Sequence, residues 1–322
     1  MNGRELRVGT LRADAGRKIS GVYLVENTTH RMPVTLINGE RPGKTVLVTA
    51  GIHGCEYVGI QAAMELAREL EPHELAGKAI LVHPVNTSGF EALAPAVIPE
   101  SGENLNRLFP GNPDGSYGER IAHALTVDFQ DQADFYLDLH GGDMSEAMTP
   151  FVFYPGEAEE AVVEESRRVA RGLAVRYMLK SKAVTGAYNS AAKRGTPSVL
   201  IERGGNGVWS RSEVDAYKAD VRRALALLGL LAASEAKDSV SQPPKEVINP
   251  VYLAAEANGC WHPAIAPGDA IGAGQKIGVL KDWFGNTVSE YHSESDAVVL
   301  YVASSLAVKK GCELVAYATA AE

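Results

Sequence analysis

The amino-acid sequence predicts an α/β fold, in which helices flank a mixed sheet, followed by a small all-β domain at the C-terminal end. Apolar, β-branched runs such as 45–50 alternate with segments of helical periodicity, as expected for an α/β sheet. Several of these runs end in His or Glu close to glycine. After residue 250, short apolar runs are separated by Gly and Pro turns, which predicts strands without helices.

The bulk composition excludes several classes of function. The chain has 322 residues and is 45% hydrophobic, so it can bury a sizeable core, and its net charge of −9 argues against a nucleic-acid partner. Three separated cysteines without a CxxC motif indicate reduced thiols, as in the cytoplasm. No apolar run approaches membrane-spanning length. We therefore expect a cytoplasmic protein without a membrane partner, and the sequence leaves open whether it is a homo-oligomer.

The hydrophobic pattern also predicts the order of the elements. The expected strands are 19–25, 32–38, 45–50, 78–85, 135–140, 151–154 and 196–202, and the expected helices are 56–70, 117–130, 157–173 and 210–233. The stretch 86–115 is rich in proline and glycine without periodicity, and such long loops are usually functional. We expect a main domain at 1–237, a polar linker at 238–250 and a β domain at 251–322.

The first strand-to-helix junction carries His53 and Glu56. Gly51 and Gly54 bracket a sharp exit from the preceding strand. If the chain is helical at His53, the i,i+3 spacing puts both side chains on one face. An imidazole and a carboxylate in this position can share one small cation, and zinc accepts both ligand types.

Two further strand ends carry His140 and Glu202. Two imidazoles and a carboxylate form the ligand set of His₂Glu zinc hydrolases, and a second carboxylate nearby would act as general base. Each signal is weak alone, because an HxxE triplet is common by chance and a strand-end His is more often structural. Four such groups, each at a strand end close to glycine, seldom coincide by chance.

With these residues in view, the chain resembles the succinylglutamate desuccinylase/aspartoacylase family of zinc-dependent hydrolases, a branch of the zinc carboxypeptidase fold. The matching stretches are GIHGCEYVG at 51–59, NLNRLFPG at 104–111, DLHGG at 138–142 and LIERG at 200–204, in the family's order. The resemblance implies one zinc ion per chain, held by His53, Glu56 and His140. It implies Glu202 as the general base and later the general acid.

The same resemblance implies that Asn106 and Arg107 bind a substrate carboxylate, for which the planar guanidinium is well suited. The chain departs from the family pattern just upstream. Family members usually carry an arginine there that helps to polarise the substrate carbonyl, whereas residues 93–102 contain none. Lys193, Arg194 and Arg203 are replacements by position only, and Arg203 is also interpreted as a solvent-facing charge. Loss of such a donor typically costs about 100-fold or more in rate.

Two neighbours of the expected ligands have other interpretations. Cys55 lies between His53 and Glu56, and we expect it to pack in the core, because i+2 on a helix faces away. Asp138 shares a strand face with His140. Its carboxylate therefore either orients the ligand imidazole or forms a buried salt bridge.

The C-terminal segment 261–317 resembles the barrel-sandwich fold of biotinyl and lipoyl carrier domains. A carrier needs a lysine at a hairpin tip, where this chain has Glu294, Ser295 and Asp296. We therefore expect no modification there. We expect instead that the domain caps the cleft and favours small substrates over peptides.

Taken together, the resemblance implies a zinc-dependent hydrolase that removes an acyl group from an N-acylated amino acid or a similar small amine. The substrate would carry a carboxylate. Two alternatives stay open, namely a metallocarboxypeptidase acting on peptides and a non-catalytic small-molecule-binding protein on the same fold. Another divalent metal in place of zinc is also compatible with the ligands.

Overall fold

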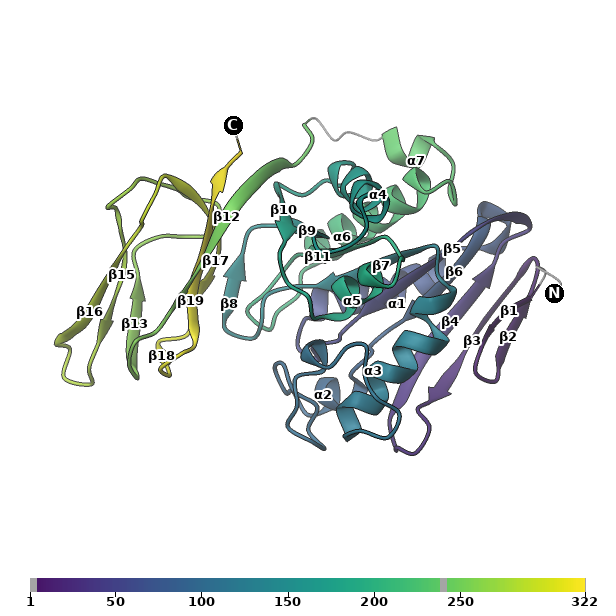
Figure 1. Cartoon of the computed structure of the whole chain (residues 1–322), viewed down its shortest axis with the longest axis horizontal. Helices are drawn as coiled ribbons and strands as arrows, with labels where there is room; N and C mark the ends of the chain where they lie inside the picture. The colour runs from purple at the N-terminus through teal and green to yellow at the C-terminus, as the bar shows by residue number, and fades with distance from the viewer. Residues whose placement is uncertain (1–4, 238–241, 322) are drawn as a thin grey trace.

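The computed structural model describes residues 5–237 and 242–321 and confirms the predicted α/β fold (Figure 1). The strands of the main part are β1 (Glu5–Val8), β2 (Leu11–Asp14), β3 (Arg17–Leu24), β4 (Arg31–Asn38), β5 (Arg41–Ala50), β6 (Ala76–Val82), β7 (Phe135–His140), β8 (Glu146–Met148), β9 (Phe151–Pro155), β10 (Tyr177–Ser181) and β11 (Ser198–Glu202). The helices are α1 (Tyr57–Glu69), η1 (Pro72–Glu74), α2 (Thr87–Glu91), η2 (Leu105–Arg107), α3 (Tyr117–Asp128), η3 (Gln130–Gln132), α4 (Glu160–Arg171), α5 (Ala187–Lys193), α6 (Arg211–Leu227) and α7 (Ser234–Lys237).

The C-terminal part consists of strands alone, as predicted. They are β12 (Lys245–Ala254), β13 (Gly259–Pro263), β14 (Ala270–Ile271), β15 (Lys276–Lys281), β16 (Thr287–His292), β17 (Ala297–Ala303), β18 (Ala307–Val308) and β19 (Glu313–Ala320). Strands β16, β15, β13 and β18 form their own antiparallel sheet. Trp261, Leu280 and Tyr317 belong to the core that this sheet shares with β17 and β19. Two packed sheets of this kind agree with the expected sandwich.

One mixed sheet runs through the whole molecule. Within the described residues it has thirteen strands, in the order β14, β17, β19, β12, β10, β9, β11, β7, β5, β6, β4 and β3, with β8 beside β17. Strands β6, β5, β7 and β11 lie parallel to one another, so their carboxyl ends meet at one edge. Functional side chains at these ends can therefore converge.

The sheet is buried on both faces because successive side chains of its central strands point to opposite sides. In β5, Val46 and Val48 pack in the core that contains α1, α4 and α6 residues, whereas Leu47 packs in the core that contains α3 and α5 residues. The helices therefore form a layer on each face. None of the helices in the described ranges has the length and apolar character needed to cross a membrane.

The structure differs from the sequence prediction in several elements. The predicted helix at 56–70 begins at Tyr57, so His53 lies in a turn rather than in a helix. The loop expected at 86–115 contains α2 and η2. Strand β10 and helix α5 were not predicted. Helix α6 ends at Leu227, before the predicted residue 233, because Gly229 adopts a φ of +84° that an α-helix cannot continue.

The expected linker at 238–250 also has a different character. Residues 238–241 lie outside the described residues, but Lys245 already opens strand β12. This strand pairs in parallel with β10, where Tyr177 lies opposite Lys245, and antiparallel with β19. Backbone hydrogen bonds therefore join the C-terminal strands directly to the main sheet.

One buried ion pair ties α6 to the sheet. Asp220 is fully buried, accepts a hydrogen bond from the Arg203 guanidinium at 2.7 Å, and accepts another from the Ala174 backbone N–H at 2.7 Å. Arg203 is only 6% exposed, so its charge depends on this partner. The alternative of a solvent-facing Arg203 is therefore wrong.

We predict that Asp220→Ala lowers the free energy of unfolding by about 3 to 5 kcal/mol, because it leaves the Arg203 charge buried without its main partner. Chemical denaturation followed by circular dichroism measures this loss. The control is Asp215→Ala on the same helix, whose side chain is 58% exposed and whose loss should cost less than about 1 kcal/mol. Equal costs for the two variants would contradict the assignment.

Candidate active site

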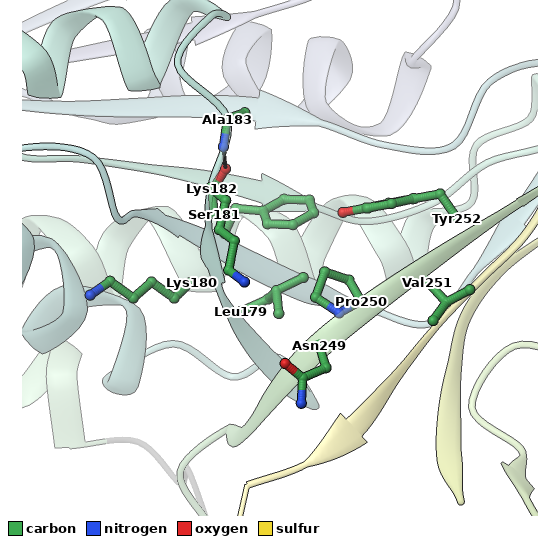
Figure 2. A pocket seen from close by; sticks show the side chains of 10 residues that line it. Leu179, Lys180, Ser181, Lys182, Ala183, Asn249, Pro250, Val251 and Tyr252 are labelled. Carbon is green, nitrogen blue, oxygen red and sulfur yellow. Dashed lines mark hydrogen bonds between the residues drawn. The ribbon is translucent and has the colours of Figure 1, made fainter. Parts of the chain in front are cut away.

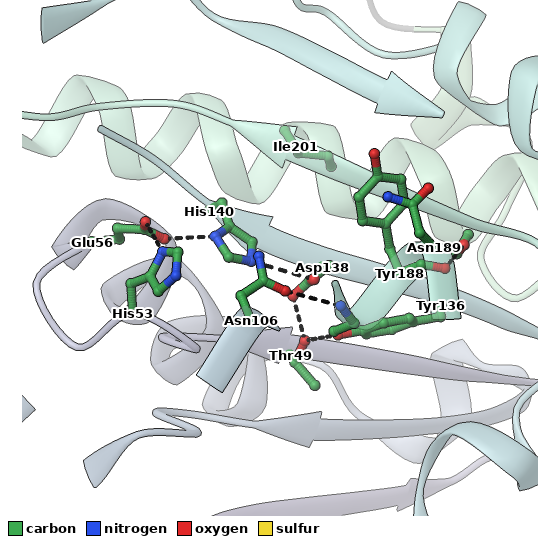
Figure 3. Close-up of polar contacts among 12 residues, drawn as sticks. Thr49, His53, Glu56, Asn106, Tyr136, Asp138, His140, Tyr188, Asn189 and Ile201 are labelled. Atoms are coloured by element: carbon green, nitrogen blue, oxygen red, sulfur yellow. Dashed lines mark hydrogen bonds and ion pairs between the residues drawn. The ribbon is translucent and has the colours of Figure 1, made fainter. Parts of the chain in front are cut away.

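His53 and Glu56 lie in the sharp turn between β5 and α1. Gly51 has a φ of +73°, and a Cβ on Gly54 would come within 2.3 Å of the Phe90 backbone nitrogen, so only glycine fits these positions. The turn brings the His53 Nδ1 atom within 2.7 Å of Glu56 Oε1 (Figure 3). The two side chains thus meet in a turn, whereas the sequence prediction assumed a helical conformation at His53.

His140 reaches the same point from the end of β7. Its side chain is buried, and its Nδ1 atom lies 3.0 Å from Glu56 Oε2 (Figure 3). One potential ligand atom from each of His53, Glu56 and His140 lies within 4.8 Å of the others. The structure therefore brings the three predicted metal ligands together.

The outer nitrogens of both imidazoles also have oxygen partners. His53 Nε2 lies 3.2 Å from Asn104 Oδ1, and His140 Nε2 lies 3.3 Å from Asp138 Oδ2. Asp138 is itself held by the Thr49 hydroxyl, which donates to Oδ1 at 2.8 Å. His53 Nε2 can donate its proton to Asn104, whereas His140 Nε2 makes only an ionic contact with Asp138 and no hydrogen bond with any described residue. With its proton on Nε2, each imidazole can offer Nδ1 to a cation beside Glu56. Both proposed roles of Asp138, as an orienting group and as a buried ionic partner, agree with this contact.

These residues fit a small divalent cation. Burial alone would raise the pKa of Glu56, but the adjacent His140 and His53 imidazoles bring this pKa down to about 2, so the carboxylate is ionised at neutral pH. Its buried Oε2 atom lies 3.0 Å from His140 Nδ1 but forms no hydrogen bond with any described residue. A buried charge of this kind is stabilised by a cation. Two imidazoles and one carboxylate form a zinc ligand set that leaves one coordination position open.

Glu202 lies at the end of β11, directly opposite His140 in the parallel register of β11 and β7. Burial is the largest effect on its carboxyl group and raises its pKa well above the usual range, although His140 acts in the opposite direction. Its Oε2 atom is buried and has no hydrogen-bond partner among the described residues. A carboxyl group with a raised pKa beside a metal centre is suited to proton transfer.

Asn106 and Arg107 come from η2, in the stretch that the sequence left as a loop. Asn106 is buried, and its Oδ1 atom accepts a hydrogen bond from the Ala187 backbone N–H at 2.9 Å, at the beginning of α5. Arg107 is exposed and has no ion-pair partner within the described ranges. Both side chains line the same cavity of about 590 Å³ as the three metal-ligand candidates and Glu202. Arg107 is therefore free to meet a carboxylate.

The cavity also includes residues that sequence reasoning missed. Tyr188 and Asn189 line it from α5, and Tyr252, Tyr301 and Glu313 line it from the C-terminal strands. Helix α5 is short and buried over Ala187–Ala192, so it has no amphipathic pattern to reveal it. Tyr252 and Tyr301 lie in strands that were expected to form a separate domain.

A second cavity of about 500 Å³ adjoins the first and shares four lining residues with it, Phe153, Ser181, Ala183 and Tyr252 (Figure 2). Its remaining lining comes from the ends of β10 and from β12, including Lys180, Lys182 and Asn249. Two adjoining cavities therefore lie between the main part of the chain and the C-terminal strands, and the first of them contains the metal-ligand candidates.

The three residues that we considered as replacements for the arginine of the family pattern, Lys193, Arg194 and Arg203, lie outside the described lining of the cavity. Arg194 donates hydrogen bonds to Ser190 and Gln130, and Arg203 is paired with Asp220. Cys55 is buried, and its thiol lies within hydrogen-bond distance of two acceptors, the Pro95 carbonyl and the Asp143 carboxylate. Burial raises its pKa, so it packs as expected.

Comparisons with known proteins agree with this geometry. Residues 42–228 match the model of the succinylglutamate desuccinylase/aspartoacylase catalytic domain. The chain is 30% identical over 280 residues to the N-alpha-acetyl-L-2,4-diaminobutyric acid deacetylase of Halomonas elongata, and the match covers 83% of this chain and 80% of that protein.

Solved structures show the same fold. A succinylglutamate desuccinylase/aspartoacylase from Rhodobacter sphaeroides superposes with a TM-score of 0.86 at 23% identity, over 98% of this chain and 100% of that one. The product-bound ectoine utilization protein of Ruegeria pomeroyi superposes with a TM-score of 0.82 at 23% identity, over 93% of each chain. The family match and the deacetylase relative together show that this chain belongs to the succinylglutamate desuccinylase/aspartoacylase family.

Proposed function

We propose that this chain is a zinc-dependent deacylase that hydrolyses the amide bond of an N-acylated amino acid or a similar small amine. The observation that carries the proposal is the convergence of two imidazoles, one ionised carboxylate and one carboxyl group of raised pKa in a single cavity. Membership of a deacylase family supports amide hydrolysis as the reaction class.

In this proposal the Nδ1 atoms of His53 and His140 and the carboxylate of Glu56 hold one zinc ion. When bound there, zinc would lower the pKa of a water ligand toward about 7 and polarise the substrate carbonyl. Asn104 accepts a hydrogen bond from His53 Nε2, and Asp138 lies in ionic contact with His140 Nε2, which supports the ring orientations that binding would require.

Glu202 is the proposed general base and later the general acid. Its carboxylate takes a proton from the water as that water adds to the carbonyl carbon and forms the new C–O bond, and it then gives this proton to the amine nitrogen as the C–N bond breaks and the carbonyl reforms. The raised pKa makes the ionised Glu202 carboxylate a stronger base, and a bound cation nearby would promote its ionisation.

Asn106 and Arg107 are the proposed binding residues for a substrate carboxylate. The exposed, unpaired guanidinium of Arg107 can form two parallel hydrogen bonds with a carboxylate. The relative from Halomonas elongata deacetylates N-alpha-acetyl-L-2,4-diaminobutyric acid, which makes acetylated small amino acids the first substrates to test.

The C-terminal part, expected from residue 251, is proposed to cap the cleft. Tyr252, Tyr301 and Glu313 narrow the cavity that the main part opens. A cavity enclosed from this side favours a small substrate over a peptide chain, which makes a carboxypeptidase the less favoured alternative.

Metal binding is tested with His53→Ala and His140→Ala. We expect about one zinc ion per chain in the wild type and almost none in either variant, because a three-ligand site loses its geometry with any one ligand. Mass spectrometry of gently purified protein measures the metal, and His262→Ala, which removes an exposed histidine far along the chain, is the control. A metal-free wild type, after zinc has been added back, would support the non-catalytic binding protein instead.

The role of Glu202 is tested with Glu202→Gln. This variant should keep its zinc and lose about 100- to 10,000-fold in kcat, since the amide cannot accept the proton. Zinc content and turnover of an acetylated amino acid are measured on the same sample. Unchanged turnover would remove Glu202 from the mechanism.

The role of Arg107 is tested with Arg107→Ala. We expect kcat/KM to fall about 10- to 100-fold on acetylated amino acids, because a charged hydrogen-bonded pair with the substrate carboxylate is lost. Acetylated amines without a carboxylate should be turned over as by the wild type. An equal loss on both substrate classes would exclude a carboxylate-binding role.

A further inference from the structure

The active-site cavity carries more acidic side chains than the proposed function uses. Five carboxyl groups line it, those of Glu56, Asp143, Glu146, Glu202 and Glu313, whereas Arg107 is the only Lys or Arg side chain in its described lining. Glu56 is assigned to the metal and Glu202 to proton transfer. Asp143 accepts a hydrogen bond from Cys55. Glu146 and Glu313 therefore remain without a function.

Glu146 lacks a counter-charge. It lies on the short strand β8, is partly buried, and has no side-chain hydrogen bond or ion pair with any described residue. Burial, followed by the nearby charges of Glu56, Asp143 and Glu313, raises its pKa to about 8. Every charged group that perturbs it is thus another acid, and a cation bound beside Glu146 would lower this pKa and leave the carboxyl group ionised.

Glu313 stands beside it at the first position of β19. Its Oε2 atom accepts a hydrogen bond from the Tyr301 hydroxyl. Strand β8 pairs with β17, which carries Tyr301 opposite Met148 and Ala303 opposite Glu146, so the C-terminal strands fix both acids at one wall of the cavity. Glu313 leaves its second carboxylate oxygen for another donor.

The side-chain oxygen of Asn189 is a second, independent sign that the ligand of this cavity carries a hydrogen-bond donor. Asn189 lines the cavity and is only 3% exposed. Its amide nitrogen donates to the Thr185 carbonyl at 3.2 Å, but its Oδ1 atom is buried and has no partner among the described residues. A buried acceptor without a donor costs free energy, so a ligand that supplies N–H groups is favoured here.

We propose that Glu146, assisted by Glu313, binds an ammonium group of the substrate, so that the preferred substrate is an N-acylated diamino acid whose second amine is free. The proposal rests on the proposed deacylase function and names its substrate class. Arg107 binds the substrate carboxylate and Glu146 binds the ammonium group. Because Arg107 and Glu146 hold the substrate carboxylate and ammonium group at two separate places, they orient the amide bond of the substrate toward Glu202. Substrates that lack either charge bind less well.

The test compares two substrates that differ only in the second amine, N-alpha-acetyl-2,4-diaminobutyrate and N-acetyl-2-aminobutyrate. The wild type should prefer the first substrate. Glu146→Gln keeps the shape of the side chain and should lower kcat/KM on the diamino substrate by about 10- to 100-fold, while leaving the other substrate nearly unchanged. Glu313→Gln should reduce the same preference by a smaller factor, because this residue is more exposed.

The matched control is Glu294→Gln, which makes the same charge change at an exposed position in the turn between β16 and β17. It should leave the preference intact. A wild type without preference for the diamino substrate would overturn the proposal. An equal loss on both substrates in Glu146→Gln would also overturn it, since that result indicates a structural role.

Binding separates this proposal from the proposed function. If neither substrate is hydrolysed, the deacylase assignment fails, and calorimetry on the zinc-loaded protein then decides the ammonium site with the same two compounds, N-alpha-acetyl-2,4-diaminobutyrate and N-acetyl-2-aminobutyrate, as probes. Binding of the diamine about 10-fold or more tightly, lost in Glu146→Gln, would support the site. Equal binding of the two probes would reject it.

Discussion

The contact on which the site depends is the meeting of one buried carboxylate with two imidazoles. Glu56 is 6% exposed, and its two oxygens lie 2.7 and 3.0 Å from the Nδ1 atoms of His53 and His140. An ionised carboxylate is costly to bury unless a positive group or a metal faces it. The imidazoles come from the ends of β5 and β7, whose parallel register places Ala50 opposite Leu139. The order of the strands and the glycines of the turn thus together bring His53, Glu56 and His140 into contact.

The sequence predicted this cluster because the carboxyl ends of parallel strands meet at one edge. His53, His140 and Glu202 each end a buried run, so they converge once the strands pair. The spacing argument for His53 and Glu56 assumed a helix, yet the turn gives the same meeting of side chains. Asn189 was beyond prediction, since its helix α5 is short, buried over Ala187–Ala192 and lacks an apolar stripe.

The C-terminal strands contribute to the cavity because they are attached to the main sheet by strand pairing. The polar and proline-bearing stretch before them was interpreted as a linker, but β12 pairs with β10 from Lys245 onward. Backbone pairing between strands holds Tyr301 and Glu313 in fixed positions relative to the catalytic edge, which a flexible tether would not do. The strands that carry the residues narrowing the cavity therefore belong to the same sheet as the strands that end at His140 and Glu202. Sequence patterns cannot reveal this, because pairing partners far apart in the chain leave no local signal.

The missing arginine and the surplus of acids have one explanation in terms of charge. A guanidinium placed in the cavity near Glu146 would form an ion pair with it and cancel the charge that a cationic substrate needs. The arginines that might have done so are engaged elsewhere, as Arg203 is with Asp220. With Arg107 as the only Lys or Arg side chain in the described lining, positive and negative groups are left unpaired for a substrate that carries both charges. In the proposed arrangement, the absence of the upstream arginine keeps the acidic side of the cavity available for the substrate ammonium group, so that Glu146 would distinguish substrates by an amine that takes no part in the reaction.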